Sequence, residues 1–341
     1  MLTPKYVLLS ICLAIACTEL FTAATRAGLI TSGGTNALLG VWGGSNSPPW
    51  HTWMGRYPDY QAGNSSMGGG GAGSNPCTAN GGYPSVVNFS HINLGGPFPD
   101  AHSAARGGYN SAYRTTINNL IAPCADRIYY ARIDWEWVGD WESHSPFHKA
   151  KGTELNNPVD PTTWVAGVRQ LIQLLKSDPR TAHIKIEFDA PVTPQQQAYY
   201  PGDDVVDAVG TDIYFDPRTY GADSHVAWTD ALTGASQTHN VTANLNVLAA
   251  FATAHNKPII IGEWGDMYRD GYNIAQFANW IKTHNVVAQA YWDMNYGLPD
   301  GDGSALQDVA ARKQAYISAF GNTHYVGTFW PILHPIPTGQ F

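Results

Sequence analysis

Charged side chains are scarce in this chain of 341 residues. Asp, Glu, Lys and Arg together make up only 13% of it, about half of the share that is usual in globular proteins. Their balance is acidic, with a formal net charge of −8. A nucleic-acid-binding protein needs a basic surface, so this composition argues against that class. Hydrophobic residues reach 44%, which argues against an intrinsically disordered chain.

Cysteine is also rare, and continuous hydrophobic runs are short. No segment after the N-terminal one reaches the 18 or so consecutive apolar residues that a membrane-spanning helix needs. Of the four cysteines, Cys12 and Cys17 lie near the N-terminus, and only Cys77 and Cys124 lie further along the chain. In an exported protein such a pair predicts one disulfide within the chain, and two buried free thiols are the alternative.

The N-terminal segment has the order of parts found in a secretory signal. Lys5 comes first, an apolar run follows over residues 6–17, and small residues continue to Ala27. This order predicts a signal peptide at residues 1–27 and a secreted or periplasmic protein over residues 28–341, with no membrane insertion once the signal is removed. A lipoprotein anchored at Cys17 is the alternative.

Glycine, proline and aromatic residues are plentiful. The chain has 35 Gly, 22 Pro and 12 Trp, and its aromatic share is 12%. Low charge together with many Trp and Tyr favours a neutral, polyhydroxylated ligand. A long segment without clear periodicity, residues 45–82, begins with aromatic residues and continues into a glycine run. A loop of this length is either functional or disordered, and its aromatic start favours a role in shaping a cleft.

Apolar runs alternate with segments of helical periodicity along most of the chain. Strands are expected at residues 36–44, 85–93, 126–137, 184–190, 204–215, 257–263 and 286–293. Helices are expected at residues 109–121, from Asp160 onward, and at 241–255, 274–284 and about 305–320. This alternation predicts a parallel sheet covered by helices, and about eight such units fit a single-domain (β/α)8 TIM barrel. An open doubly wound sheet is the alternative, but no G-x-G-x-x-G turn follows any strand.

Reactive side chains of a barrel stand at the C-terminal ends of its strands, and few acidic residues hold that position here. They are Glu136, Glu187, Asp189, Asp212, Glu263 and Asp293. Any one of them could simply pair with a nearby arginine, because a carboxylate that follows an apolar run is costly to bury without a partner.

Two of these acidic residues stand out because tryptophans surround them. Glu136 has Trp135 and Trp141 near it, and Glu263 is followed by Trp264. Glycoside hydrolysis needs two carboxylates, one to protonate the leaving oxygen and one to attack the sugar or to activate water. Aromatic rings supply flat apolar faces on which sugars stack. The pattern therefore indicates a glycosidase.

Three segments, in order, resemble glycoside hydrolase family 26, the β-mannanase type. Residues 132–141 (RIDWEWVGDW) resemble its fourth-strand signature, in which an Arg precedes His-Glu-Met-Asn-Gly and a Trp follows. Residues 199–214 (YYPGDDVVDAVGTDIY) and 257–265 (KPIIIGEWG) are similar to its sixth and seventh strands. Together the similar segments extend over about residues 36–297.

The resemblance implies a retaining endo-β-glycosidase that works by double displacement. Glu136 would be the acid/base and Glu263 the nucleophile. Tyr214 would hold the nucleophile by a hydrogen bond, and Arg132 would keep it ionised from below. Trp292, at the end of the eighth strand, would be the platform under the cleaved sugar. No cofactor is expected.

The chain also departs from the family pattern. Trp135 replaces the family's His, and Val138 replaces its Asn, so the sugar specificity does not carry over. A mannan-like polymer, β-xylan, β-glucan or a bacterial exopolysaccharide all remain open as the substrate, with a less common polymer favoured over plain mannan. Trp42 and His91, which follow the first two expected strands, are further candidates for substrate contact, as are Trp141 and Trp264.

Two other classes of function share this scaffold. A non-catalytic carbohydrate-binding barrel would have no reason to keep Glu136 and Glu263 together with their expected partners. A transglycosidase uses the same covalent intermediate and stays open. His144 and His148 could suggest a metal site, but no H-E-x-x-H motif and no third ligand accompany them, so no metal is expected.

Overall fold

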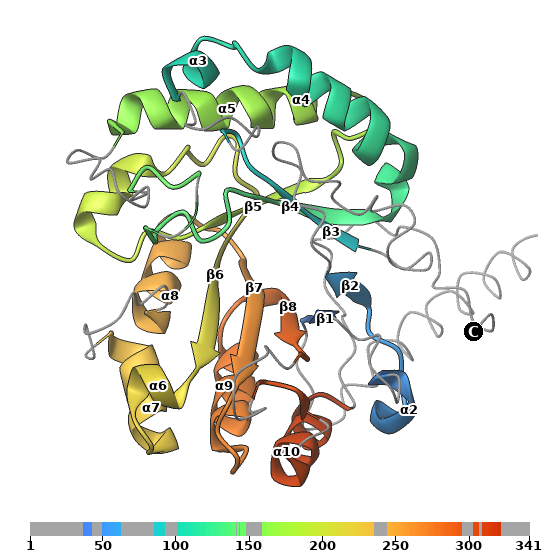
Figure 1. Ribbon diagram of the computed structural model, residues 1–341, viewed down its shortest axis with the longest axis vertical. Coiled ribbons are helices and arrows are strands. Elements are labelled where there is room, and N and C mark those ends of the chain that lie inside the picture. Colours follow the sequence, from blue (N-terminus) through green and yellow to red (C-terminus); the bar gives the residue numbers. More distant parts are fainter. Residues whose placement is uncertain are drawn as a thin grey trace, which may run out of the picture.

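The strands of the molecule form one closed, parallel barrel. The computed structural model describes residues 37–42, 50–62, 85–92, 101–140, 142, 144–147, 159–234, 244–294, 303–306 and 309–321. The strands follow one another around the barrel in sequence order, and the first closes against the last (Figure 1). They are β1 (Leu38–Trp42), β2 (Tyr60–Ala62), β3 (Ser85–Phe89), β4 (Ile128–Ile133), β5 (Lys185–Asp189), β6 (Ala208–Phe215), β7 (Ile259–Asp266) and β8 (Val286–Trp292). The predicted (β/α)8 barrel is confirmed.

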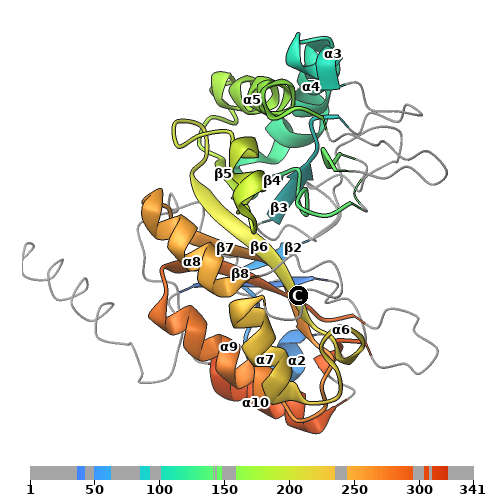
Figure 2. The same ribbon diagram turned by 90° about the vertical axis from the view of Figure 1, so that its left-hand side faces the viewer.

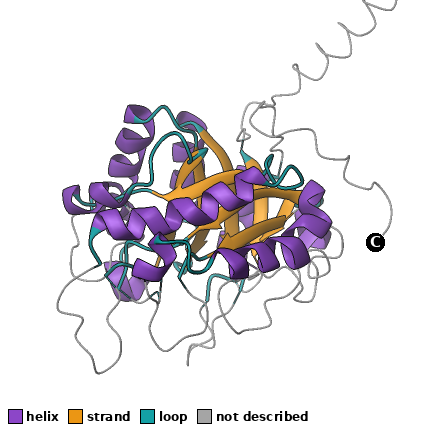
Figure 3. Ribbon diagram, turned by 90° about the horizontal axis from the view of Figure 1, so that it is seen from above, coloured by secondary structure: helices purple, strands orange, loops and turns teal. Residues whose placement is uncertain are grey.

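Helices surround this barrel, as the view from above shows (Figure 3). The α-helices of the described part are α2 (Trp50–Met54), α3 (Ala101–Ala105), α4 (Asn110–Thr116), α5 (Pro161–Ser177), α6 (Pro217–Tyr220), α7 (Ser224–Thr233), α8 (Leu245–Ala254), α9 (Tyr272–Thr283) and α10 (Ala310–Phe320). The described part also contains a π-helical turn, η1 (Ile117–Ile121), and two 3₁₀ helices, η2 (Ala122–Arg127) and η3 (Pro194–Tyr199). Helices α3, α4 and α5 cover one side of the barrel, and α7, α9 and α10 cover the opposite side (Figure 2).

Helix α5 begins where its sequence predicts. The side chain of Asp160 accepts a hydrogen bond of 2.9 Å from the backbone N–H of Thr163, and Pro161 occupies the first helical position, as is common at helix starts. The residues with helical spacing, among them Trp164 and Val168, are buried against the barrel. This helix therefore contributes its apolar face to the core.

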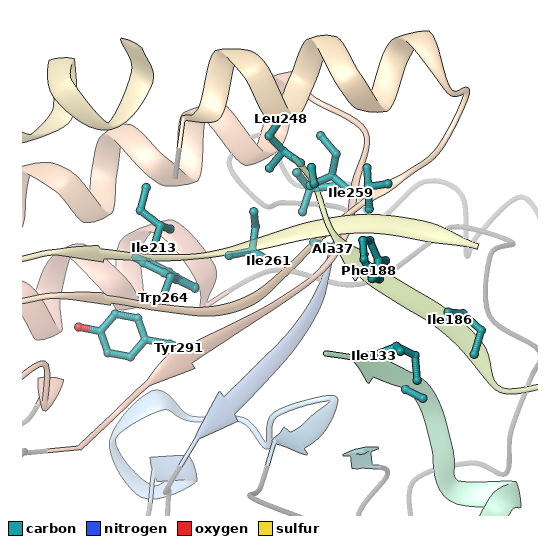
Figure 4. Close-up of a cluster of buried hydrophobic side chains, with 14 of the residues drawn as sticks. Ala37, Ile133, Ile186, Phe188, Ile213, Leu248, Ile259, Ile261, Trp264 and Tyr291 are labelled. Atoms are coloured by element: carbon teal, nitrogen blue, oxygen red, sulfur yellow. The ribbon is translucent and has the colours of Figure 1, made fainter. Parts of the chain in front are cut away.

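Apolar side chains form two layers, one on each side of the sheet. The outer layer lies between strands and helices and includes Phe188, Ile213 and Trp264 (Figure 4). The inner layer fills the barrel and includes Trp42 and Trp292. Because successive side chains of a strand point to opposite faces, the position of a residue along its strand decides which layer it joins.

The second strand is the part of the barrel that the sequence analysis missed. Residues 45–82 were expected to be irregular, but they contain α2 and β2. Strand β2 has three residues, too few for a pattern of alternation to be visible. The ring of Tyr60 packs directly on Gly40 of β1, where any side chain would overlap it. The glycine-rich residues 63–82 lie outside the described residues.

Several predictions concern segments outside the described residues. They include the signal segment at residues 1–27, Cys77 and Trp141. Cys124 is disulfide-bonded, and its pairing with Cys77 stays a prediction. Among the helices that are described, none combines the length and the apolar character that crossing a membrane requires.

Candidate active site

A single guanidinium group inside the barrel gathers four carboxyl groups. Arg132 of β4 is fully buried, and its Nη1, Nη2 and Nε donate to Glu263 at 2.9 Å, Asp212 at 2.6 Å and Glu187 at 3.2 Å. Asp189 forms a longer ion pair of 3.8 Å with Nη2. The carboxyl groups come from β5, β6 and β7, the strands that follow β4 around the barrel. One cation is thus shared among four carboxyl groups.

Two glycines make room for this cluster. A Cβ atom at Gly262 of β7 would overlap the guanidinium of Arg132, and one at Gly210 of β6 would overlap the carboxyl group of Glu187. Glycine is therefore required at both positions because buried charged groups lie directly against the backbone of the strands. The sequence segment that carries Glu263 thus also provides the space for its partner.

Both carboxylate oxygens of Glu263 are held by hydrogen bonds. Oε1 accepts from Arg132, and Oε2 accepts from the hydroxyl of Tyr214 at 2.8 Å. Burial raises the pKa of Glu263 to about 7, although Arg132 and the Tyr214 hydrogen bond lower this pKa and the charge of Glu136 raises it. Arg132 contacts Glu263, but its charge does not outweigh the effect of burial on this pKa.

The acidic side chains beneath Glu263 also have perturbed pKa values. Burial, together with the charge of Asp189, raises the pKa of Glu187 well above its usual value. Burial also raises the pKa of Asp212, against the opposing effect of Arg132. Burial therefore opposes ionisation of both carboxyl groups. The sequence analysis identified Glu187 and Asp212 only as acidic residues of strands. Their shared contact with Arg132 becomes evident once the register of β4, β5 and β6 is known.

Glu136 lies in the turn that follows β4, and it is half-buried. Its backbone has φ = 55°, in the left-handed region that non-glycine residues rarely adopt. Its N–H donates a hydrogen bond of 2.6 Å to Oδ2 of Asp189. Because its charge contributes to the raised pKa of Glu263, the two glutamates are within electrostatic reach of each other. The catalytic roles of Glu136 and Glu263 stay a prediction.

An aromatic pair stands beside Glu263 inside the barrel. Trp42 and Trp292 are register partners at the ends of β1 and β8, and their rings stack with centroids 5.1 Å apart. The ring of Tyr214 meets Trp292 edge-on at 6.4 Å. Trp42 Nε1 donates to the carbonyl of Gly262, the residue before Glu263, at 3.0 Å. Both tryptophans are buried in the inner layer beside the cluster, and their contact with a substrate stays a prediction.

Trp264 does not belong to this inner layer, so its predicted substrate contact is wrong. The side chain is fully buried in the outer layer, where Figure 4 shows it near Ile213 and Tyr291. Its indole N–H donates to Gln289, and its ring packs against Tyr291 and Phe277 at 4.7 and 4.8 Å. The physical reason is the alternation of a strand: Glu263 points into the barrel, so the next residue points out.

His91 is likewise wrong as a predicted sugar contact. It is fully buried, and its ring meets Trp164 of α5 edge-on at 5.1 Å. Its Nδ1 lies 2.6 Å from one oxygen of Asp134, and its N–H donates to the other oxygen at 2.9 Å. Burial opposes ionisation of Asp134, but the charge and hydrogen bonds of His91 outweigh it and lower the pKa of Asp134. His91 thus supports the turn that carries Glu136.

The described residues include no group of three or more His, Cys, Asp or Glu side chains that could hold a metal ion. His144 contacts the carbonyl of Trp135 at 2.7 Å through Nε2, and its ring packs on the Trp135 ring at 4.6 Å. His148, the other histidine of the conceivable metal pair, lies outside the described residues. His144 therefore acts as a support for the turn.

No protein-family model and no curated protein sequence matches the chain. Its barrel is similar to solved structures of polysaccharide hydrolases. A mannanase of Bacillus subtilis shares 15% identity at a TM-score of 0.51, over 91% of this chain and 92% of that one. A GH26 β-mannanase from Bacteroides ovatus shares 13% identity at a TM-score of 0.53, over 89% of this chain and 94% of the other. At these identities the similarity concerns the fold, and the chain has the barrel fold of a GH26 β-mannanase.

Proposed function

We propose that this protein is a retaining endo-β-glycosidase that hydrolyses a β-linked polysaccharide. The observation that carries the proposal is the environment of Glu263, whose two carboxylate oxygens are held by Arg132 and Tyr214 while Glu136 lies within electrostatic reach. A nucleophile needs a fixed and at least partly ionised carboxylate, and its partner must be able to donate a proton. A barrel that only bound sugars would not require this buried arrangement.

The reaction has two steps. In the first, Glu263 attacks the anomeric carbon and forms a covalent glycosyl-enzyme, while Glu136 gives its proton to the departing glycosidic oxygen. In the second, Glu136 takes a proton from water, and the resulting nucleophile breaks the glycosyl-enzyme bond and restores Glu263. The configuration at the anomeric carbon is inverted twice and so retained. A sugar acceptor in place of water would give transglycosylation.

The walls of the site support a polymer substrate without identifying its sugar. Trp292 and Trp42 line the inside of the barrel beside Glu263, and we propose Trp292 as the platform on which the cleaved sugar stacks. Val138 stands where the resemblance has an Asn, and it is packed against the core. One polar contact to the sugar is thereby lost. We therefore place the substrate among β-mannan-like, β-xylan, β-glucan and bacterial exopolysaccharide chains, with plain mannan less favoured.

The proposal extends to the location of the enzyme. Residues 1–27 would act as a signal peptide, and residues 28–341 would form the catalytic domain of a secreted or periplasmic protein. A polymer too large to enter a cell has to be cleaved outside the cytoplasm, which fits this reading. Mass spectrometry of the protein recovered from its native host would test it, because the N-terminal residue reports the site of cleavage.

The experiment that tests the activity measures reducing ends released from β-mannan, β-xylan, β-glucan and bacterial exopolysaccharides. The wild type is compared with Glu136→Gln and Glu263→Gln, and with Glu142→Gln as a control on the same loop. We expect release from at least one polymer, lost in both test variants and kept in the control. Binding of oligosaccharides without release by the wild type would instead support the carbohydrate-binding barrel.

Azide rescue assigns the two roles. Glu263→Ala with azide should give an α-glycosyl azide, because azide then replaces the nucleophile, whereas Glu136→Ala should give the β-anomer from the covalent intermediate. Activity that survives Glu263→Gln would mean that another residue is the nucleophile.

A further inference from the structure

The turn that carries Glu136 has an unfavourable backbone. Asp134 and Glu136 both have positive φ angles, 51° and 55°, although neither is glycine. A non-glycine residue in this region costs on the order of 1 kcal/mol or more, and it persists only where surrounding contacts hold it. The question for this turn is therefore which contacts hold its backbone.

One end of the turn is fixed by His91. The N–H and the Nδ1 of this residue engage both oxygens of Asp134, and all of these groups are buried. The backbone N–H of Asp134 also donates to the carbonyl of Phe89 at 3.1 Å. The turn is thus attached to the end of β3 before the chain reaches Glu136.

The other end is fixed by Asp189, the last residue of β5. One carboxylate oxygen accepts the N–H of Glu136 at 2.6 Å, which is short for a bond from a backbone N–H and typical of a charge-assisted one. The carbonyl of Asp189 accepts the indole N–H of Trp137 at 2.8 Å. Two consecutive residues of the turn are therefore bound to this single residue.

Asp189 also belongs to the Arg132 cluster. Its second oxygen lies 3.8 Å from Nη2 of Arg132, and the side chain also interacts with the carboxyl group of Glu187. The side chain is 3% exposed. Asp189 therefore connects the group that holds Glu263 to the backbone that carries Glu136, across the two strands β4 and β5.

We propose that Asp189 is a positioning residue that sets the location of the Glu136 carboxyl group relative to Glu263. This inference rests on the proposed function, in which Glu136 donates a proton to the leaving oxygen. Proton transfer requires the acid to lie within hydrogen-bonding reach of that oxygen. Asp189 acts through the backbone of the acid and does not touch the substrate.

The first test follows the Glu136 amide by hydrogen exchange in NMR. The amide should be protected in the wild type and in Asp189→Asn, whose side-chain oxygen still accepts its hydrogen. In Asp189→Ala its exchange should accelerate at least about tenfold, while the core strands keep their protection. Asp207→Ala is the matched control, because Asp207 accepts the backbone N–H of Ile186 at 2.8 Å before β6 begins and should leave Glu136 unaffected. Unchanged protection in Asp189→Ala would overturn the proposal.

The second test separates the loss of proton donation from a general loss of structure. It measures kcat/KM on two substrates. One is the polysaccharide that the reducing-end assay identifies as the substrate, and the other is the 2,4-dinitrophenyl β-glycoside of the disaccharide unit of that polysaccharide, whose leaving group needs no proton. Asp189→Ala should lose about 100-fold or more on the polymer and less than about fivefold on the aryl glycoside, with KM little changed. Asp189→Asn should recover most of the loss.

Equal losses on both substrates would overturn the positioning role in favour of a merely structural one. An inactive wild type would contradict the proposed function, and the exchange experiment would still decide whether Asp189 holds the turn. The two failures are therefore distinguishable.

Discussion

The hydroxyl of Tyr214 donates a hydrogen bond of 2.8 Å to Oε2 of Glu263 across the neighbouring strands β6 and β7. Arg132 occupies the other oxygen, so the carboxylate has a fixed orientation. Burial nevertheless raises its pKa to about 7. The carboxylate is thus firmly oriented while burial opposes its ionisation, so the proposed activity should depend on pH.

Removal of the Tyr214 hydroxyl should move this pH dependence. Because the hydrogen bond lowers the pKa of Glu263, Tyr214→Phe should raise that pKa above about 7. A nucleophile must be ionised, so activity falls as pH drops through this pKa, and the acidic limb of kcat/KM should move to higher pH in the variant. The loss should therefore be greater at pH 6 than at pH 9. An acidic limb at the same pH in both proteins would contradict the assignment of Glu263.

A single methyl group should disrupt the cluster. In Gly262→Ala the new Cβ would occupy the space of the Arg132 guanidinium, and displacement of a buried ion-pair partner costs about 3–5 kcal/mol. We expect a large fall in the free energy of unfolding and activity near background. Gly55→Ala is the control, because Gly55 has a positive φ but no atom near its Cβ position, and it should cost about 1 kcal/mol. Denaturant unfolding measures both, and equal costs would refute the argument.

Two tryptophans should respond differently to truncation. Trp264→Ala removes a fully buried ring from the outer core layer, and such changes cost about 3–5 kcal/mol of stability. Trp292→Ala removes a ring beside Glu263 and Tyr214, so its main effect should be on kcat/KM for the polymer. Steady-state kinetics at a temperature where both variants are folded checks this contrast. A stable Trp264→Ala with a raised KM would restore Trp264 as a substrate contact.

Asp266 should make the stability depend on pH. It is fully buried at the end of β7, and burial raises its pKa from 3.8 to about 7. Between about pH 4 and pH 7 the Asp266 carboxyl group is therefore protonated in the folded state and ionised in the unfolded state. The stability that this proton contributes is present at low pH and is lost as the pH rises. The shift corresponds to about 4 kcal/mol. Unfolding of Asp266→Asn at pH 5 and pH 8 should show a smaller decline than the wild type, and identical slopes would contradict the shift.

The fold was predictable because its signals are local. Each strand except β2 carries an apolar run, and Asp160 with Pro161 marks the start of α5 in the sequence itself. The candidate pair Glu136 and Glu263 was found because tryptophans surround both. None of these inferences required knowledge of which strands are neighbours.

The rest of the site depends on long-range geometry. Glu187 and Asp212 reach Arg132 only because β4, β5 and β6 pair in one register, which no local pattern gives. The error at Trp264 was avoidable, since strand alternation places it opposite to Glu263. The error at His91 was not avoidable from the sequence. Its partner Asp134 is 43 residues away, and the pairing of β3 and β4 is what brings the two residues together.

The left-handed backbone of Glu136 has a consequence for how this protein would evolve under selection for heat resistance alone. Glycine adopts φ = 55° without strain, so Glu136→Gly should relieve the turn, by about 1 kcal/mol or less once the greater freedom of glycine in the unfolded chain is counted. The same replacement removes the proposed acid. Under the proposed function, selection for stability and selection for catalysis would therefore favour different residues at this one position.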